Sequence, residues 1–122
     1  MRLLIADDSE LIVDRLIASL EAIRGVEIVD TAGTVERASE AARTLRPDVL
    51  ILDMRMPDGN GLEVLEGMKK DHVSCVVIVL TNFAYPQYRR KCLSSGAHFF
   101  LDKSTEFDKV GDVVRSLLPT FP

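Results

Sequence analysis

The sequence lacks the surplus of positive charge that nucleic-acid-binding domains carry. Its 15 Lys and Arg residues are outnumbered by 19 Asp and Glu residues, which gives a net charge of −4 at pH 7. A basic surface is what attracts phosphate backbones and anionic membranes. We therefore expect this chain alone to bind neither nucleic acid nor a membrane surface.

Long apolar runs and cysteine motifs are also missing. No apolar run approaches the roughly 18 residues of a membrane span. The run at the N-terminus meets Asp7 and Asp8, so it is too short for a signal peptide. Cys75 and Cys92 lie in apolar segments and lack the CxxC or Cys/His spacing of disulfide frameworks and zinc sites. These absences favour a cytoplasmic protein.

What the sequence contains is enough apolar material for one folded domain. Of its 122 residues, 47% are hydrophobic and 28% are charged. This is the composition of a globular chain rather than a disordered one. No repeat, linker or low-complexity segment interrupts it, and the length fits one domain. We expect residues 1–122 to form a single domain.

Strand and helix signals alternate along the chain. Short apolar runs typical of buried strands are each followed by apolar residues at helical spacing. The expected strands are residues 2–6, 26–32, 49–53, 75–80 and 98–101. Residues that can cap or open the helices are Ser9, Thr34, Leu62, Pro86 and, for the last helix, Ser104 or Thr105.

This alternation predicts an α/β fold, with a parallel sheet covered on both faces through right-handed crossovers. Five strand–helix units are too few for a barrel, which needs about eight. They favour a doubly wound, flavodoxin-like (βα)5 sheet with the strand order 2-1-3-4-5. That order is taken from known proteins of this class, flavodoxin and the chemotaxis regulator among them, and not from the sequence pattern.

Polar side chains come at the carboxyl ends of four predicted strands. Asp7 and Asp8 follow the first strand, Asp53 ends the third, Thr81 follows the fourth and Lys103 comes just after the fifth. Parallel strands bring these ends to one edge of the sheet, where open α/β sheets bind their ligands. In the expected order the first and third strands are neighbours, about 4.8 Å apart. Three carboxylates so close repel one another and favour a divalent cation.

Magnesium suits this cluster because it prefers oxygen ligands and combines one or two carboxylates with a phosphate. Asp8 and Asp53 fit as direct ligands, and Asp7 fits as a ligand either directly or through water. The backbone carbonyl of Arg55 is well placed to complete the set. The sequence therefore predicts a Mg²⁺ site at this edge.

An aspartate beside such a cation can attack phosphorus and become an acyl phosphate. Phosphoryl transfer then needs mainly positioning and neutralisation of charge. The Lys103 ammonium would pair with one phosphoryl oxygen, and the Thr81 hydroxyl would donate a hydrogen bond to another. Asp53 is the predicted nucleophile, and it needs no general base because an aspartate is already ionised at neutral pH.

As a set, these residues resemble the receiver domain of two-component response regulators. The likeness runs from Arg2 to about Leu118. The residues that carry it are the pair Asp7-Asp8, the segment LDMRMPDGNGLEVL around Asp53, Thr81, and Lys103 seven positions after Gly96. The resemblance implies a signalling switch rather than an enzyme. Its Asp53 would be phosphorylated, with Mg²⁺, by a histidine kinase or a phosphotransfer protein.

The resemblance also implies roles for other residues. Thr81 would be the switch hydroxyl, Lys103 the essential lysine and Phe100 the aromatic switch. The fourth helix, fifth strand and fifth helix would form the signalling face, and the first helix near Leu11 and Ile12 would dock the phosphodonor. Because Phe100 has no hydroxyl to satisfy, we expect its ring to lie inward for a substantial fraction of the time even without phosphate.

The sequence defines the output of the switch and its partners less well than it defines the site. Few residues follow Leu118, so the chain would act through a protein target, or as a piece of a regulator whose C-terminal output domain is missing. A phosphorylation-dependent dimer is a further option. The kinase and its signal are not encoded in a recognisable way.

Two positions depart from the family pattern and keep alternatives open. Ser104 stands where the family commonly has a cis proline, and Asn82 where a small residue is usual. One alternative is a degenerate receiver that binds partners without taking phosphate. The other is a haloacid-dehalogenase-like phosphatase, but that family has Asp-x-Asp after its first strand, whereas Asp7 and Asp8 are adjacent.

Overall fold

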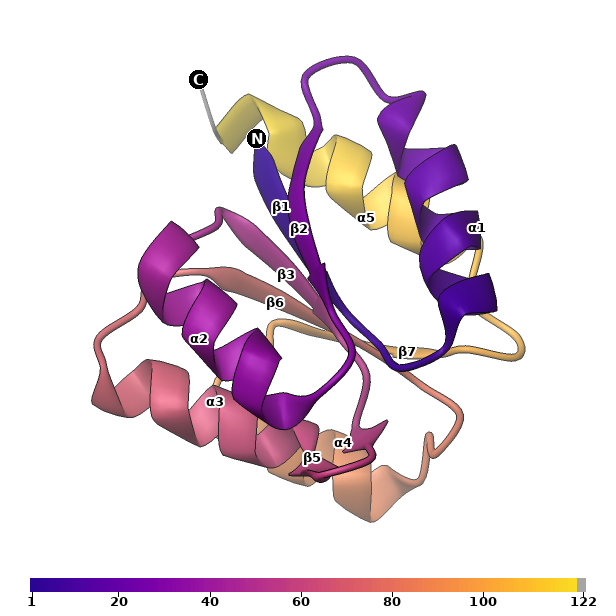
Figure 1. The fold of residues 1–122 in the computed structure, drawn as a ribbon. Helices are drawn as coiled ribbons and strands as arrows, with labels where there is room; N and C mark the ends of the chain where they lie inside the picture. Colours follow the sequence, from indigo (N-terminus) through magenta and orange to yellow (C-terminus); the bar gives the residue numbers. More distant parts are fainter. Residues whose placement is uncertain (121–122) are drawn as a thin grey trace.

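A five-stranded parallel sheet forms the centre of the computed structural model, which describes residues 1–120 (Figure 1). The strands are β1 (Arg2–Ala6), β2 (Glu27–Ala32), β3 (Val49–Leu52), β6 (Val76–Thr81) and β7 (Phe99–Asp102). Their order is β2-β1-β3-β6-β7. The predicted flavodoxin-like order, 2-1-3-4-5 when only these strands are counted, is confirmed.

The central strand β3 brings the candidate site together. Its four residues are apolar and buried, because it lies between β1 and β6 with helices on both faces. Leu52 is level with Ala6 on β1 and with Val79 on β6. The residues that follow these strands therefore meet, and the backbone N–H of Asp53 donates to the carbonyl of Ala6 at 2.9 Å.

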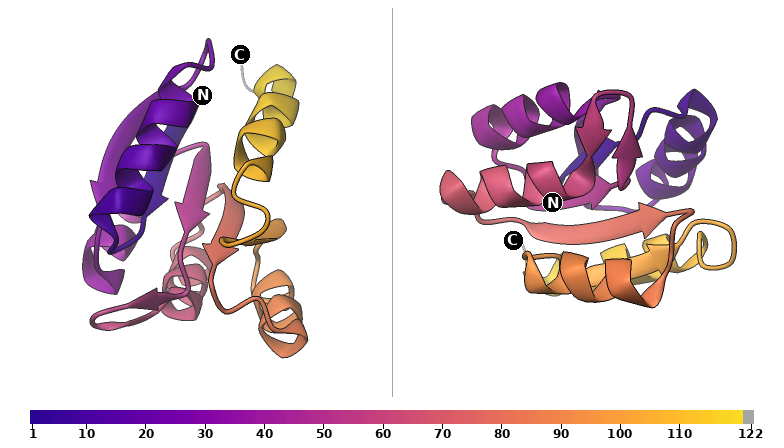
Figure 2. Two further views of the ribbon diagram at one scale, coloured as in Figure 1. Left: turned by 90° about the vertical axis from the view of Figure 1, so that its right-hand side faces the viewer. Right: turned by 90° about the horizontal axis from the view of Figure 1, so that it is seen from below.

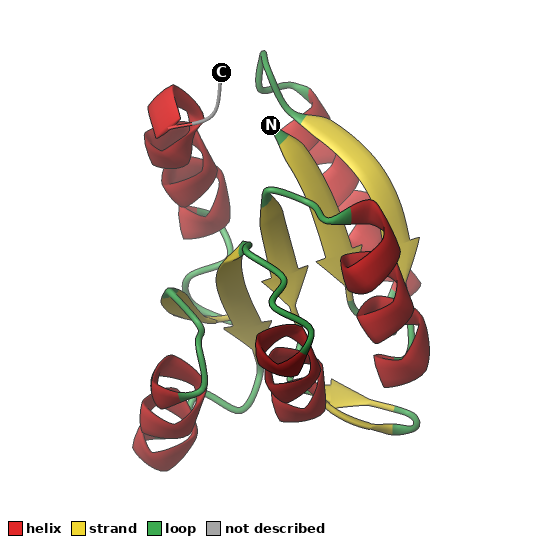
Figure 3. Ribbon diagram, turned by 90° about the vertical axis from the view of Figure 1, so that its left-hand side faces the viewer, coloured by secondary structure: helices red, strands yellow, loops and turns green. Residues whose placement is uncertain are grey.

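Helices cover both faces of the sheet, in two layers that Figures 2 and 3 show from other sides. One face carries α2 (Val35–Leu45), α3 (Gly61–Lys70) and α4 (Pro86–Ser94), and the other carries α1 (Glu10–Glu21) and α5 (Lys109–Leu117). Each layer has its own apolar core. Among the described residues, none of these helices has the length and apolar character of a membrane span.

Side-chain caps begin three of the helices. Ser9 accepts a hydrogen bond from the backbone N–H of Ile12, and Thr34 accepts one from that of Arg37, as the sequence predicts for these two caps. Asn60 caps α3, because its side chain accepts a hydrogen bond from the backbone N–H of Leu62. Each cap satisfies a backbone donor that the first helical turn leaves without a partner.

The last helix begins later than predicted, so the expectation of a cap at Ser104 or Thr105 is wrong. Helix α5 starts at Lys109. The carboxylate of Asp102 accepts hydrogen bonds from both the backbone N–H and the hydroxyl of Ser104, at 2.9 and 2.6 Å. This contact uses the Ser104 hydroxyl in a turn, so it does not cap the helix. No cis peptide bond occurs within residues 1–120, including at Ser104.

The turn after Asp53 is a short hairpin, made of β4 (Arg55–Met56) and β5 (Gly59–Asn60). Its tip reaches α2, because the Asp58 carboxylate accepts hydrogen bonds from the backbone N–H groups of Val35 and Glu36 at 2.7 and 3.1 Å. Those hydrogen bonds hold the pKa of Asp58 below its ordinary value of 3.8. Thr34 and Asp58 together cap the same helix.

Replacing Asp58 by Ala should destabilise the fold in a pH-dependent way. Since the folded-state pKa is lowered, the carboxylate contributes stability that is fully present above the unfolded-state value near 3.8 and is lost as the pH falls towards the folded-state value. Urea unfolding of the unchanged protein and of Asp58→Ala across this pH range measures the contribution of the carboxylate to stability. A stability gap that stays constant from neutral to acidic pH would contradict this role of the charge.

Candidate functional site

The carboxyl ends of the strands gather the predicted residues at one edge of the sheet. Carboxylate oxygens of Asp7, Asp8 and Asp53 lie within 4.8 Å of one another. The Lys103 ammonium is 3.3 Å from the Asp53 carboxylate. The expectation that these side chains share one site is therefore confirmed as geometry. Their chemical roles remain predictions.

Lys103 makes its shorter contact with Asp7, at 2.7 Å. The other Asp7 oxygen accepts a hydrogen bond from the backbone N–H of Ser9 at 2.9 Å. Both oxygens of Asp7 are thus already engaged, and its carboxylate orients the lysine towards the cluster. The backbone N–H of Lys103 donates to the carbonyl of Thr81 at 2.8 Å, which fixes the start of the loop after β7.

Asp53 is an aspartate held where its charge is unfavourable. It is 6% exposed, and this burial raises its pKa above the ordinary value, with the negative charge of Asp7 adding to the effect. The Lys103 ammonium and the Met54 backbone N–H, which donates at 2.8 Å, lower the pKa and offset part of the shift. The site therefore favours a further positive charge beside Asp53.

The cluster fits a hard divalent cation by its donor chemistry. Three carboxylates from two neighbouring strand ends supply oxygen ligands, and one lysine does not neutralise them. Asp8 is exposed, whereas Asp7 and Asp53 are buried, so the cluster opens to solvent on the Asp8 side.

The site opens into a cavity of about 470 Å³. Arg55 and Phe83 line it together, and the guanidinium of Arg55 stacks over the Phe83 ring at 4.2 Å. Arg15 on α1 also lines it and stacks over the ring of Phe107 at 4.2 Å. The sequence gives no sign that Arg15 reaches this cavity, because its stacking partner Phe107 lies far along the chain. Phe107, expected inside the last helix, precedes that helix.

Thr81 and Phe100 lie on the neighbouring strands β6 and β7. Thr81 is fully buried, and its hydroxyl accepts a hydrogen bond from the backbone N–H of Phe83 at 3.0 Å. The Phe100 ring points inward and is 6% exposed. Arg89 on α4 donates to the Phe100 carbonyl at 3.2 Å. The arrangement places α4 in direct contact with the residue predicted to switch.

Comparison with protein families matches residues 3–115 to the response regulator receiver domain. The chain belongs to the response regulator receiver family. Its fold, its acidic cluster and its lysine are those expected of this family from the sequence. The phosphatase and the degenerate binding module are not favoured.

Similar receiver proteins come from several bacteria. The uncharacterized transcriptional regulatory protein YvfU of Bacillus subtilis is 36% identical over 115 residues, which cover 94% of this chain and 58% of YvfU. The response regulator domain of Thermotoga maritima CheB is 26% identical, with a TM-score of 0.86 and coverage of 98% and 94% of the two chains. CheY of Borrelia burgdorferi, solved as a complex with CheX, BeF3 and Mg²⁺, is 28% identical, with a TM-score of 0.87 and coverage of 96% and 88%. The chain spans about half the length of several curated relatives that it matches.

Proposed function

We propose that this receiver domain is a phosphoacceptor switch in which Asp53 takes a phosphoryl group from a histidine kinase or a phosphotransfer protein. The observation that supports this most directly is the Lys103 ammonium, which lies 3.3 Å from Asp53 and lines the same cavity. Together with the adjacent acidic cluster, it forms a site built to hold the transferred group.

In the transfer step, a carboxylate oxygen of Asp53 forms a bond to phosphorus while the phosphorus–nitrogen bond of a phosphohistidine breaks. The electron pair of the broken bond leaves with the imidazole. Lys103 neutralises charge on the transferred group, and the rim residues Arg55 and Phe83 limit the entry of water. The product is an acyl phosphate on Asp53.

Asp8, Asp53 and the Arg55 backbone carbonyl would hold Mg²⁺, with Asp7 assisting directly or through water. The cation supplies neutralisation of the carboxylates and of the incoming phosphoryl oxygens. The complex of the similar Borrelia burgdorferi CheY with BeF3 and Mg²⁺ supports this assignment. So does the raised pKa of Asp53, which reflects burial and the nearby charge of Asp7.

The phosphoryl group is read out through Thr81 and Phe100. Its charge of roughly −1.5 to −2 attracts the Thr81 hydroxyl by a charge-assisted hydrogen bond. Thr81 then gives up the bond from the Phe83 backbone, and the packing around Phe100 changes. Through Arg89 this change reaches α4, so α4, β7 and α5 form the signalling face.

The receiver acts on a partner and has no substrate of its own. It assists only its own phosphorylation and dephosphorylation, as one domain over residues 1–122. It passes the signal to a protein target or to an output domain of a longer regulator, with a phosphorylation-dependent dimer as one form of output.

The phosphodonor docks near Leu11 and Ile12 on α1. The free thiols of Cys75 and Cys92 agree with a cytoplasmic location.

Incubation with acetyl phosphate and Mg²⁺, followed by intact-mass spectrometry, tests this function. A switch gains about 80 Da, the mass of one phosphoryl group, and keeps it. Continuous release of inorganic phosphate without an adduct would identify a phosphatase. Neither adduct nor release would identify a binding module. EDTA should abolish the adduct.

Replacing Phe83 by Ala should shorten the lifetime of the acyl phosphate. Without the ring, the Arg55 guanidinium loses its stacking partner and water gains access to the phosphoryl group. We expect hydrolysis on the order of tenfold faster, about 1.4 kcal/mol in the barrier. Loss of the adduct over time after removal of acetyl phosphate measures it. Phe107→Ala, which removes the ring from the Arg15 stack, is the matched control and should leave the lifetime unchanged.

A further inference from the structure

The stacked pair of Arg55 and Phe83 separates two cavities. Both residues line the cavity that contains Asp53, and both also line a second cavity of about 300 Å³ beside the hairpin of β4 and β5. Among the described residues, they are the two that line both cavities. The guanidinium lies 4.2 Å from the centre of the ring, so the pair forms a common wall. An occupant of the second cavity, the hairpin cavity, would therefore contact the surroundings of Asp53.

The hairpin cavity has a mainly apolar lining that suits an aromatic ring. Its apolar side chains are those of Met54, Met56, Leu62, Phe83 and Tyr88. Methionine thioethers adapt to the shape of an occupant and make favourable contacts with aromatic rings. Sites for small molecules typically measure roughly 300–1,000 Å³ and are lined in this way, with a few polar groups. None of the described lining residues comes from β7 or α5.

Two polar side chains of the hairpin add hydrogen-bond donors. Arg55 on β4 is paired with Asn60 on β5, and side chains paired in this way project from the same face of a hairpin. The Asn60 oxygen accepts from the backbone N–H of Leu62 at 2.9 Å, which leaves its amide N–H groups as donors. Within residues 1–120, the ion pairs involve other cations than Arg55. None of the described lining residues carries a carboxylate, so the donors complement one on a ligand.

We propose that the hairpin cavity binds a small aromatic carboxylic acid in its ionised form. The ring system lies between the methionines and Tyr88. The carboxylate pairs with the Arg55 guanidinium and accepts a hydrogen bond from the Asn60 amide. The inference rests on the proposed function in one respect, namely that the Arg55–Phe83 wall limits the entry of water to the acyl phosphate. By packing against this wall, the bound acid lengthens the lifetime of the acyl phosphate.

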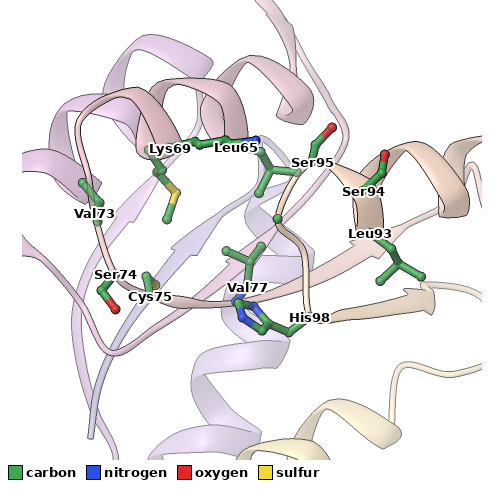
Figure 4. A pocket seen from close by; sticks show the side chains of 12 residues that line it. Leu65, Lys69, Val73, Ser74, Cys75, Val77, Leu93, Ser94, Ser95 and His98 are labelled. Atoms are coloured by element: carbon green, nitrogen blue, oxygen red, sulfur yellow. The ribbon is translucent and has the colours of Figure 1, made fainter.

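A separate cavity of about 410 Å³, at the amino ends of β6 and β7, provides an internal reference (Figure 4). Leu65 lines it from α3, and Leu93 lines it from the end of α4. Met68 also lines this cavity, whereas Met54 and Met56 line the hairpin cavity. The methionine signals in an NMR spectrum therefore report which of the two cavities an added acid enters.

The probe for the test is naphthoate, titrated into the unphosphorylated chain with isotope-labelled methionine methyl groups. The signals of Met54 and Met56 should shift, and those of Met1 and Met68 should stay in place. Naphthamide has the same rings without the charge, and the decahydro form of naphthoate has the charge without the aromatic rings. Each of these counterparts should bind about tenfold more weakly than naphthoate.

Paired variants decide whether the binding is specific. Arg55→Gln should weaken binding of naphthoate about tenfold. Arg15→Gln removes the same charge from the other arginine–aromatic stack, which does not line the hairpin cavity, and should leave binding within about twofold. Tyr88→Ala should also weaken binding, whereas Tyr85→Ala, at a neighbouring ring that is 54% exposed, should not. Dispersed amide spectra confirm that each variant is folded.

The effect on the wall has its own measurement. Saturating naphthoate should slow the loss of the phosphoryl adduct, followed by intact mass after removal of acetyl phosphate, by at least about twofold. Naphthamide at the same concentration should leave the rate unchanged. An unchanged rate with naphthoate bound would overturn the effect on the wall.

The binding site itself is overturned if the Met68 signal shifts as strongly as those of Met54 and Met56. It is also overturned if naphthamide binds as tightly as naphthoate, or if the two arginine variants weaken binding equally. Because the titration uses unphosphorylated protein, its failure leaves the acetyl phosphate result intact. Conversely, absence of an adduct on Asp53 would overturn the proposed function and leave the titration result standing.

Discussion

Replacing Asp53 by Asn should abolish phosphoryl uptake and, in metal-free buffer, make the fold more stable. Uptake is lost because an amide is not a nucleophile towards phosphorus. Stability rises because burial and the charge of Asp7 raise the pKa of Asp53, so the ionised side chain is less favourable in the folded than in the unfolded state. Phosphoryl uptake should fall while stability rises, so a loss of uptake in this variant cannot be caused by unfolding.

The pH dependence of this stability gap follows from the sign of the shift. The free energy of unfolding of Asp53→Asn should exceed that of the unchanged protein by the full amount above the raised folded-state pKa. This difference should disappear as the pH falls below the ordinary value of 3.8, where Asp53 is protonated in both states. Intact mass with acetyl phosphate and thermal unfolding with EDTA provide the two readouts. Asp71→Asn, at the exposed C-cap of α3, should leave uptake intact. A variant at Asp53 that is still labelled at full strength would refute the assignment.

Adding one methyl group at Gly61 should be strongly destabilising, and the same change at Gly67 should not. A Cβ at Gly61 would lie 2.7 Å from the backbone carbonyl of Asp53, 3.1 Å from the Met54 sulfur and 3.2 Å from a side-chain carbon of Leu52. Backbone at that distance must move, and overpacking of this kind typically destabilises by about 1–3 kcal/mol. Since the displaced atom belongs to Asp53, slower phosphoryl uptake is expected as well.

Gly67, six residues further along α3, is the matched control. Nothing lies within 4 Å of a Cβ built there. Gly67→Ala should therefore stabilise α3 by about 0.5–1 kcal/mol through the helix propensity of alanine. Urea unfolding of both variants gives the comparison. Equal effects at the two positions would show that the close approach of Gly61 to Asp53 is not what constrains this helix.

The sequence allowed prediction of the elements whose determinants are local. The run of apolar residues before Asp53 indicates a strand buried on both faces, and β3 is such a strand. Ser9 and Thr34 cap helices because their hydroxyls reach the backbone N–H three residues on. Parallel strands then bring Asp53 and Lys103 together without any further information.

What could not be predicted depends on partners distant in sequence or on competing partners. Ser104 has the chemistry of a helix cap, but Asp102 takes its hydroxyl first. Asp58 resembles an ordinary turn residue, and its role in capping α2 becomes visible only when the hairpin is folded. The stack of Arg15 on Phe107 has no local signature at all.

The separation of Asp7 from its lysine partner has a consequence for protein synthesis. Asp7 and Lys103, whose side chains lie 2.7 Å apart, are 96 positions apart in sequence. A ribosome delivers all three acids of the cluster well before it delivers the lysine. We expect a nascent or prematurely terminated chain that stops before β7 to contain Asp53 but to remain unable to hold the phosphoryl group.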